Sequence, residues 1–151
     1  MHVLAAVLAL LSPAFHHGAR IPARYTCTGA NVSPPLRWTA PPRRTRSLAL
    51  LMIDPDAPGG AFTHWTLWNL PPTRRSLPAR FRWRWQGRNS AGSTGYTGPC
   101  PPAGPKHHYT FTLYALNRML TLPRGAPASA VFSAVAPHAR ATATLVGVYS
   151  R

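Results

Sequence analysis

Eighteen prolines occur among the 151 residues, and they constrain the fold of this chain more than any other feature. Proline fixes its own φ angle and lacks a backbone N–H, so it interrupts helices and is excluded from the middle of a sheet. The sequence therefore predicts short strands joined by fixed turns, with no long helix. The chain is long enough for one domain with a real core, and its apolar content of 45% is typical of a globular protein.

Apolar segments between the prolines predict the strands. Residues 47–53 are almost continuously apolar, which is the pattern of a central strand buried on both faces. This strand should end at Asp54, because Pro55 cannot donate to a β-ladder. Further strands are predicted within 29–42 and at 64–70, 81–85, 109–116 and 142–149, and a helix is predicted at 126–136.

Acidic side chains are confined to one short stretch. Asp54 and Asp56 are the two acidic residues of the chain, and they flank Pro55 at the expected strand end. A carboxylate pair held by prolines at this place is a candidate site. The segment Gly98-Pro99-Cys100-Pro101-Pro102-Ala103-Gly104 is also unusual, because prolines stiffen a backbone while glycines allow close approach. We interpret it as a stiff pocket wall, with a rigid connector as the alternative.

Several spaced motifs occur in a fixed order. They are Asp-Pro-Asp-Ala-Pro at 54–58, His64-Trp65 with Asn69-Leu70-Pro71, Gly-Pro-Cys-Pro-Pro at 98–102, and His107-His108-Tyr109 with Phe111 and Tyr114-Ala115-Leu116. With these motifs the chain resembles the phosphatidylethanolamine-binding protein family, and most of all its bacterial and archaeal branch, often called Raf-kinase-inhibitor-like proteins. The similarity runs from about Ser12 to Tyr149.

This resemblance implies a mainly β fold, in which a large antiparallel sheet packs on a smaller one and a short helix lies near the C-terminus. It implies a single domain over residues 12–151, preceded by the apolar segment 1–11. It also implies a small pocket for phosphate groups, including phospholipid headgroups, with no metal or other cofactor. Carried onto this sequence, the pocket residues are Asp54, His64, Gly98, Cys100, Pro101, Pro102, His107 and Tyr109.

The chemistry of these side chains suits an anion. Two imidazoles can donate hydrogen bonds to phosphate oxygens, more strongly when protonated, and Tyr109 can donate its phenolic hydrogen. An ionised Asp54 only accepts, so we expect it to orient a histidine and favour its protonated form, or to share a proton with the ligand. Asp56 is expected to fold back onto nearby backbone amides as a structural turn residue. Ligand affinity should rise as pH falls through the histidine range.

The function implied is non-catalytic binding of a phosphorylated or other anionic ligand, with a role as an inhibitor or regulator of a kinase or protease. No catalytic residue is assigned. One alternative is a metalloenzyme, because two histidines and one carboxylate are the ligand set of a facial-triad iron site. Another is a charge-driven binder of nucleic acid or an anionic membrane, since the formal net charge is +15. The alternating aromatic and arginine residues of 81–85 would suit either surface.

The N-terminal segment and the cysteines bear on location. Residues 3–11 are apolar but too short to span a bilayer, and the positive start of a signal peptide is missing. We interpret them as a first buried strand and expect a cytoplasmic protein, or a periplasmic or secreted one if residues 1–14 act as a signal. Cys27 and Cys100 permit one disulfide, which we expect only in an oxidising compartment. The sequence is also compatible with a homodimer.

Overall fold

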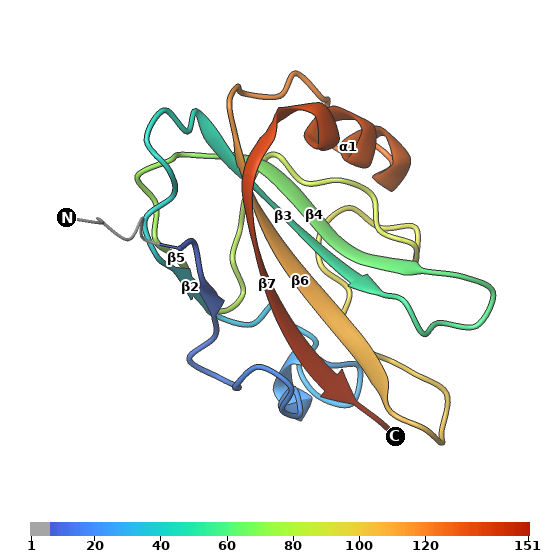
Figure 1. The fold of residues 1–151 in the computed structure, drawn as a ribbon. Helices are drawn as coiled ribbons and strands as arrows, with labels where there is room; N and C mark the ends of the chain where they lie inside the picture. The colour runs from blue at the N-terminus through green and yellow to red at the C-terminus, as the bar shows by residue number, and fades with distance from the viewer. Residues whose placement is uncertain (1–6) are drawn as a thin grey trace.

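The computed structural model describes residues 7–151 and contains two antiparallel sheets (Figure 1). The larger sheet has four strands in the order β4-β3-β6-β7, and the smaller has three in the order β1-β2-β5. The larger sheet comprises β3 (Ser47–Asp54), β4 (Phe62–Leu70), β6 (His107–Leu116) and β7 (Ala139–Tyr149). The smaller sheet comprises β1 (Leu10–Leu11), β2 (Leu36–Trp38) and β5 (Ser76–Leu77). This is the mainly β fold that the sequence predicted.

Helical structure is short. The helix α1 (Ala128–Val135) follows Pro127 and continues into a 3-10 turn, η2 (Ala136–His138), which contains Pro137. A second 3-10 turn, η1 (Ala23–Tyr25), lies in the N-terminal third of the chain. The helix expected at 126–136 is thus present, with its α-helical part limited by a proline at each end. No helix within residues 7–151 is both long enough and apolar enough to cross a bilayer.

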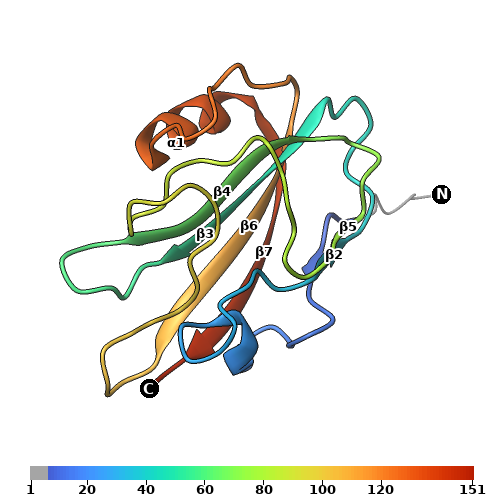
Figure 2. The same cartoon turned by 180° about the vertical axis from the view of Figure 1, so that it is seen from behind.

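The strand β3 occupies the centre of the larger sheet, because β4 and β6 pair with its two edges. Its side chains are buried on both faces. Leu48 and Leu50 contact the core that the larger sheet shares with the smaller one. Ala49 and Leu51 contact a second core beneath α1. The long connection between β5 and β6 passes over one side of the sheet, as Figure 2 shows from behind.

The strand predicted at 81–85 is wrong. Its backbone makes isolated hydrogen bonds and no β-ladder: the Phe81 N–H donates to Ser33 Oγ at 3.1 Å, and the Trp85 carbonyl oxygen accepts from the Trp68 N–H of β4 at 3.0 Å. The side chain of Trp83 donates to the Trp68 carbonyl at 2.8 Å. The aromatic side chains are nevertheless half-buried and the arginines between them exposed, so the predicted alternation of burial holds in a loop.

The apolar N-terminal segment contributes one short edge strand. In β1, Leu10 is buried and faces Trp38 of β2, whereas Leu11 is exposed. The strand interpretation is therefore confirmed for these two residues, and the burial for Leu10 alone. Residues 7–9 of the predicted segment are not in a strand, and residues 3–6 lie outside the described residues.

Candidate functional site

Antiparallel pairing brings the end of β3 beside the start of β6. Ile53 pairs with Thr110 in the register of these strands. Asp54 therefore lies beside the first residues of β6, which begins at His107. On the other edge of β3, Asp54 pairs with Phe62, and His64 follows two residues later on the same face of β4. Three chemically active side chains from distant parts of the sequence therefore meet at one edge of the larger sheet.

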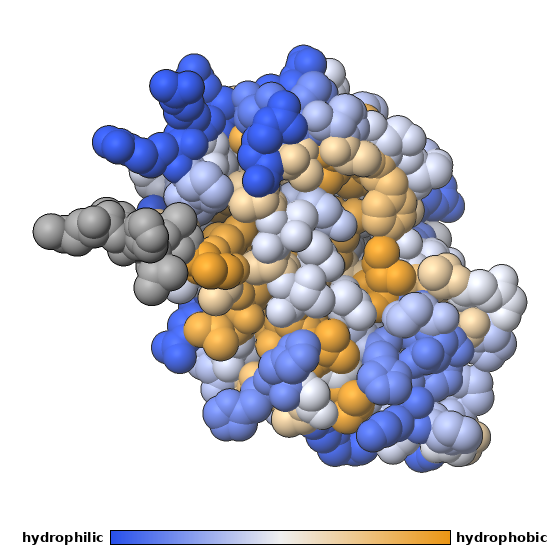
Figure 3. Space-filling model, in the orientation of Figure 1, coloured by the Kyte–Doolittle hydropathy of each residue, from blue (hydrophilic) through white to orange (hydrophobic). Residues whose placement is uncertain are grey.

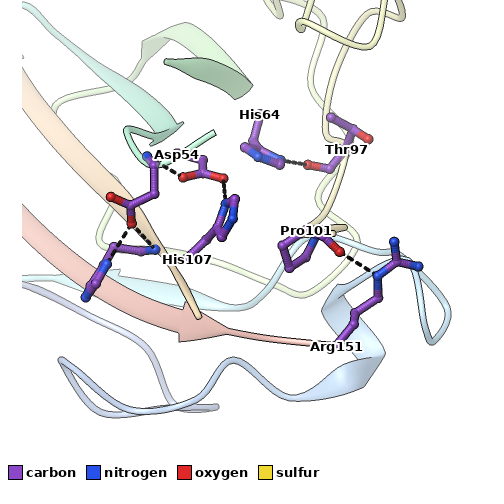
Figure 4. Close-up of polar contacts among 8 residues, drawn as sticks. Asp54, His64, Thr97, Pro101, His107 and Arg151 are labelled. Carbon is purple, nitrogen blue, oxygen red and sulfur yellow. Dashed lines mark hydrogen bonds and ion pairs between the residues drawn. The ribbon is translucent and has the colours of Figure 1, made fainter. Parts of the chain in front are cut away.

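Asp54 is a buried carboxylate with two hydrogen-bonded oxygens. Its Oδ2 lies 2.7 Å from Nδ1 of His107 (Figure 4). Its Oδ1 accepts a hydrogen bond of 2.8 Å from the backbone N–H of Asp56. Because the carboxylate only accepts hydrogen bonds, it fixes a proton on Nδ1 of His107 and the orientation of that ring. The expected orienting role of Asp54 is thus seen toward His107.

His64 is held in one tautomer. Its Nδ1 lies 2.7 Å from the carbonyl oxygen of Thr97, which can only accept, so this nitrogen carries the proton (Figure 4). Burial lowers the pKa of His64, and the Thr97 carbonyl and the Asp54 charge oppose that effect. In the neutral ring Nε2 has no hydrogen and can only accept a hydrogen bond.

Tyr109 contributes a hydroxyl that no other described residue engages. The side chain is fully buried, and its hydroxyl has no hydrogen-bond partner among residues 7–151. Burial, reinforced by the charges of Asp54 and Asp56, raises the pKa of Tyr109. The phenol therefore stays protonated and keeps a hydrogen to donate. The ring of His64 meets that of Tyr109 edge to face, with 5.2 Å between centroids.

The wall segment 98–104 is tied to the stretch around η1. The N–H of Gly98 donates to Asn31 Oδ1 at 2.8 Å, and a Cβ at this position would lie only 2.4 Å from the Tyr25 carbonyl oxygen. Arg151 Nε donates to the Pro101 carbonyl oxygen at 2.6 Å (Figure 4). Gly98, Cys100, Pro101 and Pro102 of this segment line the cavity, whereas Ala103 and Gly104 are exposed and do not.

Cys27 and Cys100 form a disulfide that joins the wall to the segment after η1. The sequence left this pairing open and tied it to an oxidising compartment. In the structure the two cysteines are paired, and backbone contacts beside them also hold the wall segment against the segment after η1. The backbone N–H of Cys27 donates to the Pro99 carbonyl at 3.0 Å, beside the disulfide.

One cavity of about 230 Å³ joins these groups. All eight residues predicted for the pocket line it: Asp54, His64, Gly98, Cys100, Pro101, Pro102, His107 and Tyr109. Five lining residues were missed: Ala57, Pro58, Phe62, Ala91 and Thr97. A signal for Phe62 was available, because it lies two residues before His64 and so shares its face of a strand. Thr97 acts through its backbone carbonyl, for which a sequence gives no signal.

Asp56 bonds to His108 of β6 and not, as was expected, to a backbone amide of its own turn. Its Oδ2 accepts the backbone N–H of His108 at 2.8 Å and lies 2.7 Å from Nδ1 of the same histidine. These bonds hold the pKa of Asp56 below its usual value. The bond to an amide of its own turn, which we expected of Asp56, is made by Asp54 instead. Asp56 is not a lining residue of the cavity, in keeping with a structural role.

The facial-triad alternative requires three ligands at metal-binding distance. Among residues 7–151, no group of three or more histidine, cysteine, aspartate or glutamate side chains is placed to hold a metal ion. Nδ1 of His64 and Nδ1 of His107 already engage Thr97 and Asp54.

Comparison with known proteins identifies the family. The model of the phosphatidylethanolamine-binding protein family matches residues 11–150. The chain belongs to this family. A UPF0098 protein of Methanothermobacter thermautotrophicus is 45% identical over 149 residues, covering 94% of this chain and 98% of that protein. LppC of Mycobacterium tuberculosis, whose name describes it as a lipoprotein, is 44% identical, with coverage of 94% of this chain and 72% of LppC.

Solved structures of the phosphatidylethanolamine-binding protein family share the fold. A family homologue from Chlamydia trachomatis superposes with a TM-score of 0.91 at 38% identity, covering 97% of this chain and 99% of its own. YbcL of Escherichia coli superposes with a TM-score of 0.90 at 31% identity and the same coverage. The relatives place this chain in the bacterial and archaeal branch of the family, as the sequence motifs indicated.

Proposed function

We propose that the protein binds a phosphorylated ligand in this cavity without transforming it. The observation that carries the proposal is that Tyr109 is a lining residue of the cavity and that its buried hydroxyl, a hydrogen-bond donor, has no partner among the described residues. A buried donor without a partner is costly, so a ligand that accepts from it would recover that cost. The histidines on either side complete a small polar site in an otherwise apolar wall.

The hydrogen-bonding roles suit a phosphoryl group that still carries a proton, or one attached to an amine. Tyr109 donates, and His107 donates from its second nitrogen when it is protonated against Asp54. Neutral His64 accepts, so it would take a hydrogen bond from a P–OH or an ammonium group. Protonation of His107 also cancels the Asp54 charge, which would otherwise repel an anion.

The proposal is for binding without catalysis. Cys100, the one thiol-bearing position of the wall, is engaged in the disulfide, and the lining residues include no serine or lysine. The ligand could be a free phosphorylated molecule, a lipid headgroup or a phosphorylated segment of a protein. In the last case the protein would act as a regulator of its partner, such as a kinase or protease. The disulfide supports a location outside the cytoplasm, which was the alternative in the sequence-based prediction.

Calorimetric titration tests the proposal. Inorganic phosphate and phosphoethanolamine would be titrated into the wild type and the Tyr109→Phe variant. Tyr114→Phe is the matched control, since it lies on the same strand but packs on the other face, against the core beneath α1. We expect saturable binding that weakens about tenfold in Tyr109→Phe and is unchanged in Tyr114→Phe. Binding that is absent in the wild type, or equal in all three proteins, would refute the proposal.

A further inference from the structure

A second cavity lies at the opposite end of the larger sheet. We call it the arginine groove; its lining residues are Arg43, Arg44, Thr45, Leu116, Asn117 and Arg140, and its volume is about 310 Å³. It forms at the upper end of the sheet in Figure 1, where β3 begins, β6 ends and β7 begins, whereas the pocket lies at the other end, where β3 ends and β6 begins. Figure 3 shows strongly hydrophilic side chains gathered along this upper edge.

The groove concentrates positive charge without a counter-charge. Three of its lining residues are arginines, and all three side chains are exposed. The two carboxylate side chains of the chain, Asp54 and Asp56, lie at the far end of β3. At about 3.3 Å per residue that strand is roughly 25 Å long, which exceeds two Debye lengths at physiological salt. The C-terminus also lies at the far end, since β7 runs away from the groove to Tyr149.

The guanidinium groups are little used by the protein itself. Within residues 7–151, Arg43 and Arg44 donate no side-chain hydrogen bond, and Arg140 donates only long ones, of 3.4 Å to Pro137 and 3.3 Å to Ala139. An arginine offers five N–H donors in a planar fork that matches phosphate oxygens. Most of the donors lining this cavity are therefore available to a ligand.

The turn that carries two of these arginines is fixed. Thr45 Oγ1 donates to the Pro42 carbonyl at 2.6 Å, and the backbone N–H of Arg46 donates to the Leu116 carbonyl at 2.8 Å. Arg44 has a φ angle of 70°, a left-handed conformation that disfavours any residue with a side chain. A glycine would adopt this turn more easily, yet the position carries a guanidinium. The arginines are thus presented from a pre-organised backbone.

We propose that the arginine groove is a binding site for a compact polyvalent anion of the diphosphate class. Three arginines line one cavity, and a ligand with two linked phosphoryl groups would bridge their guanidinium groups and neutralise their charge. The cavity limits the site to a small ligand, and a bidentate fork needs defined oxygen positions. The site uses none of the pocket residues and does not depend on the function proposed for the pocket.

Calorimetric titration with sodium pyrophosphate, at a constant ionic strength of about 0.15 M, tests this proposal. The groove variant combines Arg43→Gln, Arg44→Gln and Arg140→Gln. The matched control combines Arg82→Gln, Arg84→Gln and Arg124→Gln, which removes the same charge from exposed arginines outside the groove. Each titration is repeated with Tyr109→Phe added, so that binding in the pocket is separated from binding in the groove. Thermal melting verifies that every variant is folded.

We expect saturable pyrophosphate binding in the wild type that weakens about tenfold or more in the groove variant and less than about twofold in the charge control. Adding Tyr109→Phe should leave this pattern unchanged. Equal weakening in the groove variant and the control would overturn the proposal, because it would show diffuse attraction to net charge. It would equally be overturned if a short oligonucleotide bound while pyrophosphate did not saturate, since the surface would then serve an extended polyanion.

Discussion

At the scale of a single residue, removing the hydroxyl of Tyr109 should affect the stability of the protein and its binding of phosphate differently. The hydroxyl is buried without a hydrogen-bond partner in the described chain, so it costs the folded state about 1–3 kcal/mol of desolvation. We therefore predict that Tyr109→Phe leaves the free energy of unfolding unchanged or raises it by about 1 kcal/mol, although it weakens phosphate binding. Urea denaturation of the ligand-free protein measures the first effect and calorimetry the second.

Tyr149→Phe is the matched control for this prediction. Tyr149 is also buried, but its hydroxyl is hydrogen-bonded to Thr28. Removing it should lower the free energy of unfolding by roughly 1 kcal/mol, because Thr28 Oγ1 loses one of its two side-chain hydrogen bonds and keeps the one with Thr26 Oγ1. If Tyr109→Phe destabilised the protein as much as Tyr149→Phe does, the Tyr109 hydroxyl would have a partner in the ligand-free protein and the argument for the pocket would fail.

A second prediction at the scale of a residue concerns His64 and the pH dependence of the free energy of unfolding. Because burial lowers the pKa of His64 from the ordinary 6.5, the unfolded chain binds a proton at this position more readily than the folded one. Stability should therefore fall as pH drops below the unfolded pKa. We predict that His64→Asn, which keeps a donor for the Thr97 carbonyl but cannot titrate, loses less stability than the wild type between about pH 8 and about pH 5.5. Urea denaturation at both pH values tests this, and equal losses in both proteins would contradict it.

The side chains of the candidate site could be predicted from sequence because each has a distinctive chemistry at a predicted strand end or in the unusual wall. Their pairing could not. Nothing in the sequence shows that Asp54 engages His107 rather than His64, because that choice depends on the register between β3 and β6. The Thr97 carbonyl that sets the tautomer of His64 was equally invisible, since every residue has a carbonyl.

At the scale of elements, the wall segment 98–104 depends on its ties to the chain around η1. The Cys27–Cys100 disulfide closes a sequence separation of 73 residues, and a loop of that length restricts the unfolded chain considerably. We predict that Cys27→Ser combined with Cys100→Ser lowers the free energy of unfolding by roughly 2–4 kcal/mol. Urea denaturation of the double variant and of the oxidised wild type measures the difference.

The same double variant should keep most of the pocket. Hydrogen bonds from Gly98 to Asn31 and from the Tyr96 hydroxyl to the Tyr25 carbonyl, at 2.8 Å and 2.6 Å, still hold the wall. Phosphate affinity should therefore change by only a few-fold, and a complete loss of binding would show that the disulfide itself shapes the cavity. Unfolding at the same urea concentration as the oxidised protein would show that the cross-link is not formed.

Strand prediction succeeded where burial and hydrogen bonding agree. The apolar segment 47–53 is a central strand because it needs partners on both edges and both faces, and it has them in β3. The segment 81–85 has the alternation of a half-buried strand, but its backbone makes isolated hydrogen bonds, among them one to the Ser33 side chain and one from the Trp68 N–H, and forms no β-ladder. Alternating burial reports which side chains face the protein. It does not report where the backbone hydrogen bonds are made.

At the scale of the whole molecule, the net charge of +15 is compensated poorly, because two acidic side chains stand against seventeen lysine and arginine side chains. The arginines repel one another in the compact state more than in the expanded unfolded chain. We predict that raising NaCl from about 0.02 M to about 0.3 M increases the free energy of unfolding, because shorter Debye lengths screen this repulsion. Urea denaturation at each salt concentration measures the effect, and stability that falls or stays level would contradict it.

Sodium sulfate extends this prediction to the two proposed sites. At equal ionic strength it screens charge as NaCl does, but a divalent oxyanion can also occupy the arginine groove and the pocket, and any anion bound only by the folded state adds stability. Sulfate is also excluded from protein surfaces, which stabilises any folded protein and affects all variants alike.

The informative quantity is therefore the free energy of unfolding in sulfate minus that in chloride, which is the extra stability in sulfate. It should shrink in the groove variant and in Tyr109→Phe, but not in the charge control altered at Arg82, Arg84 and Arg124. An extra stability equal in all four proteins would mean that sulfate acts through exclusion alone and occupies neither site.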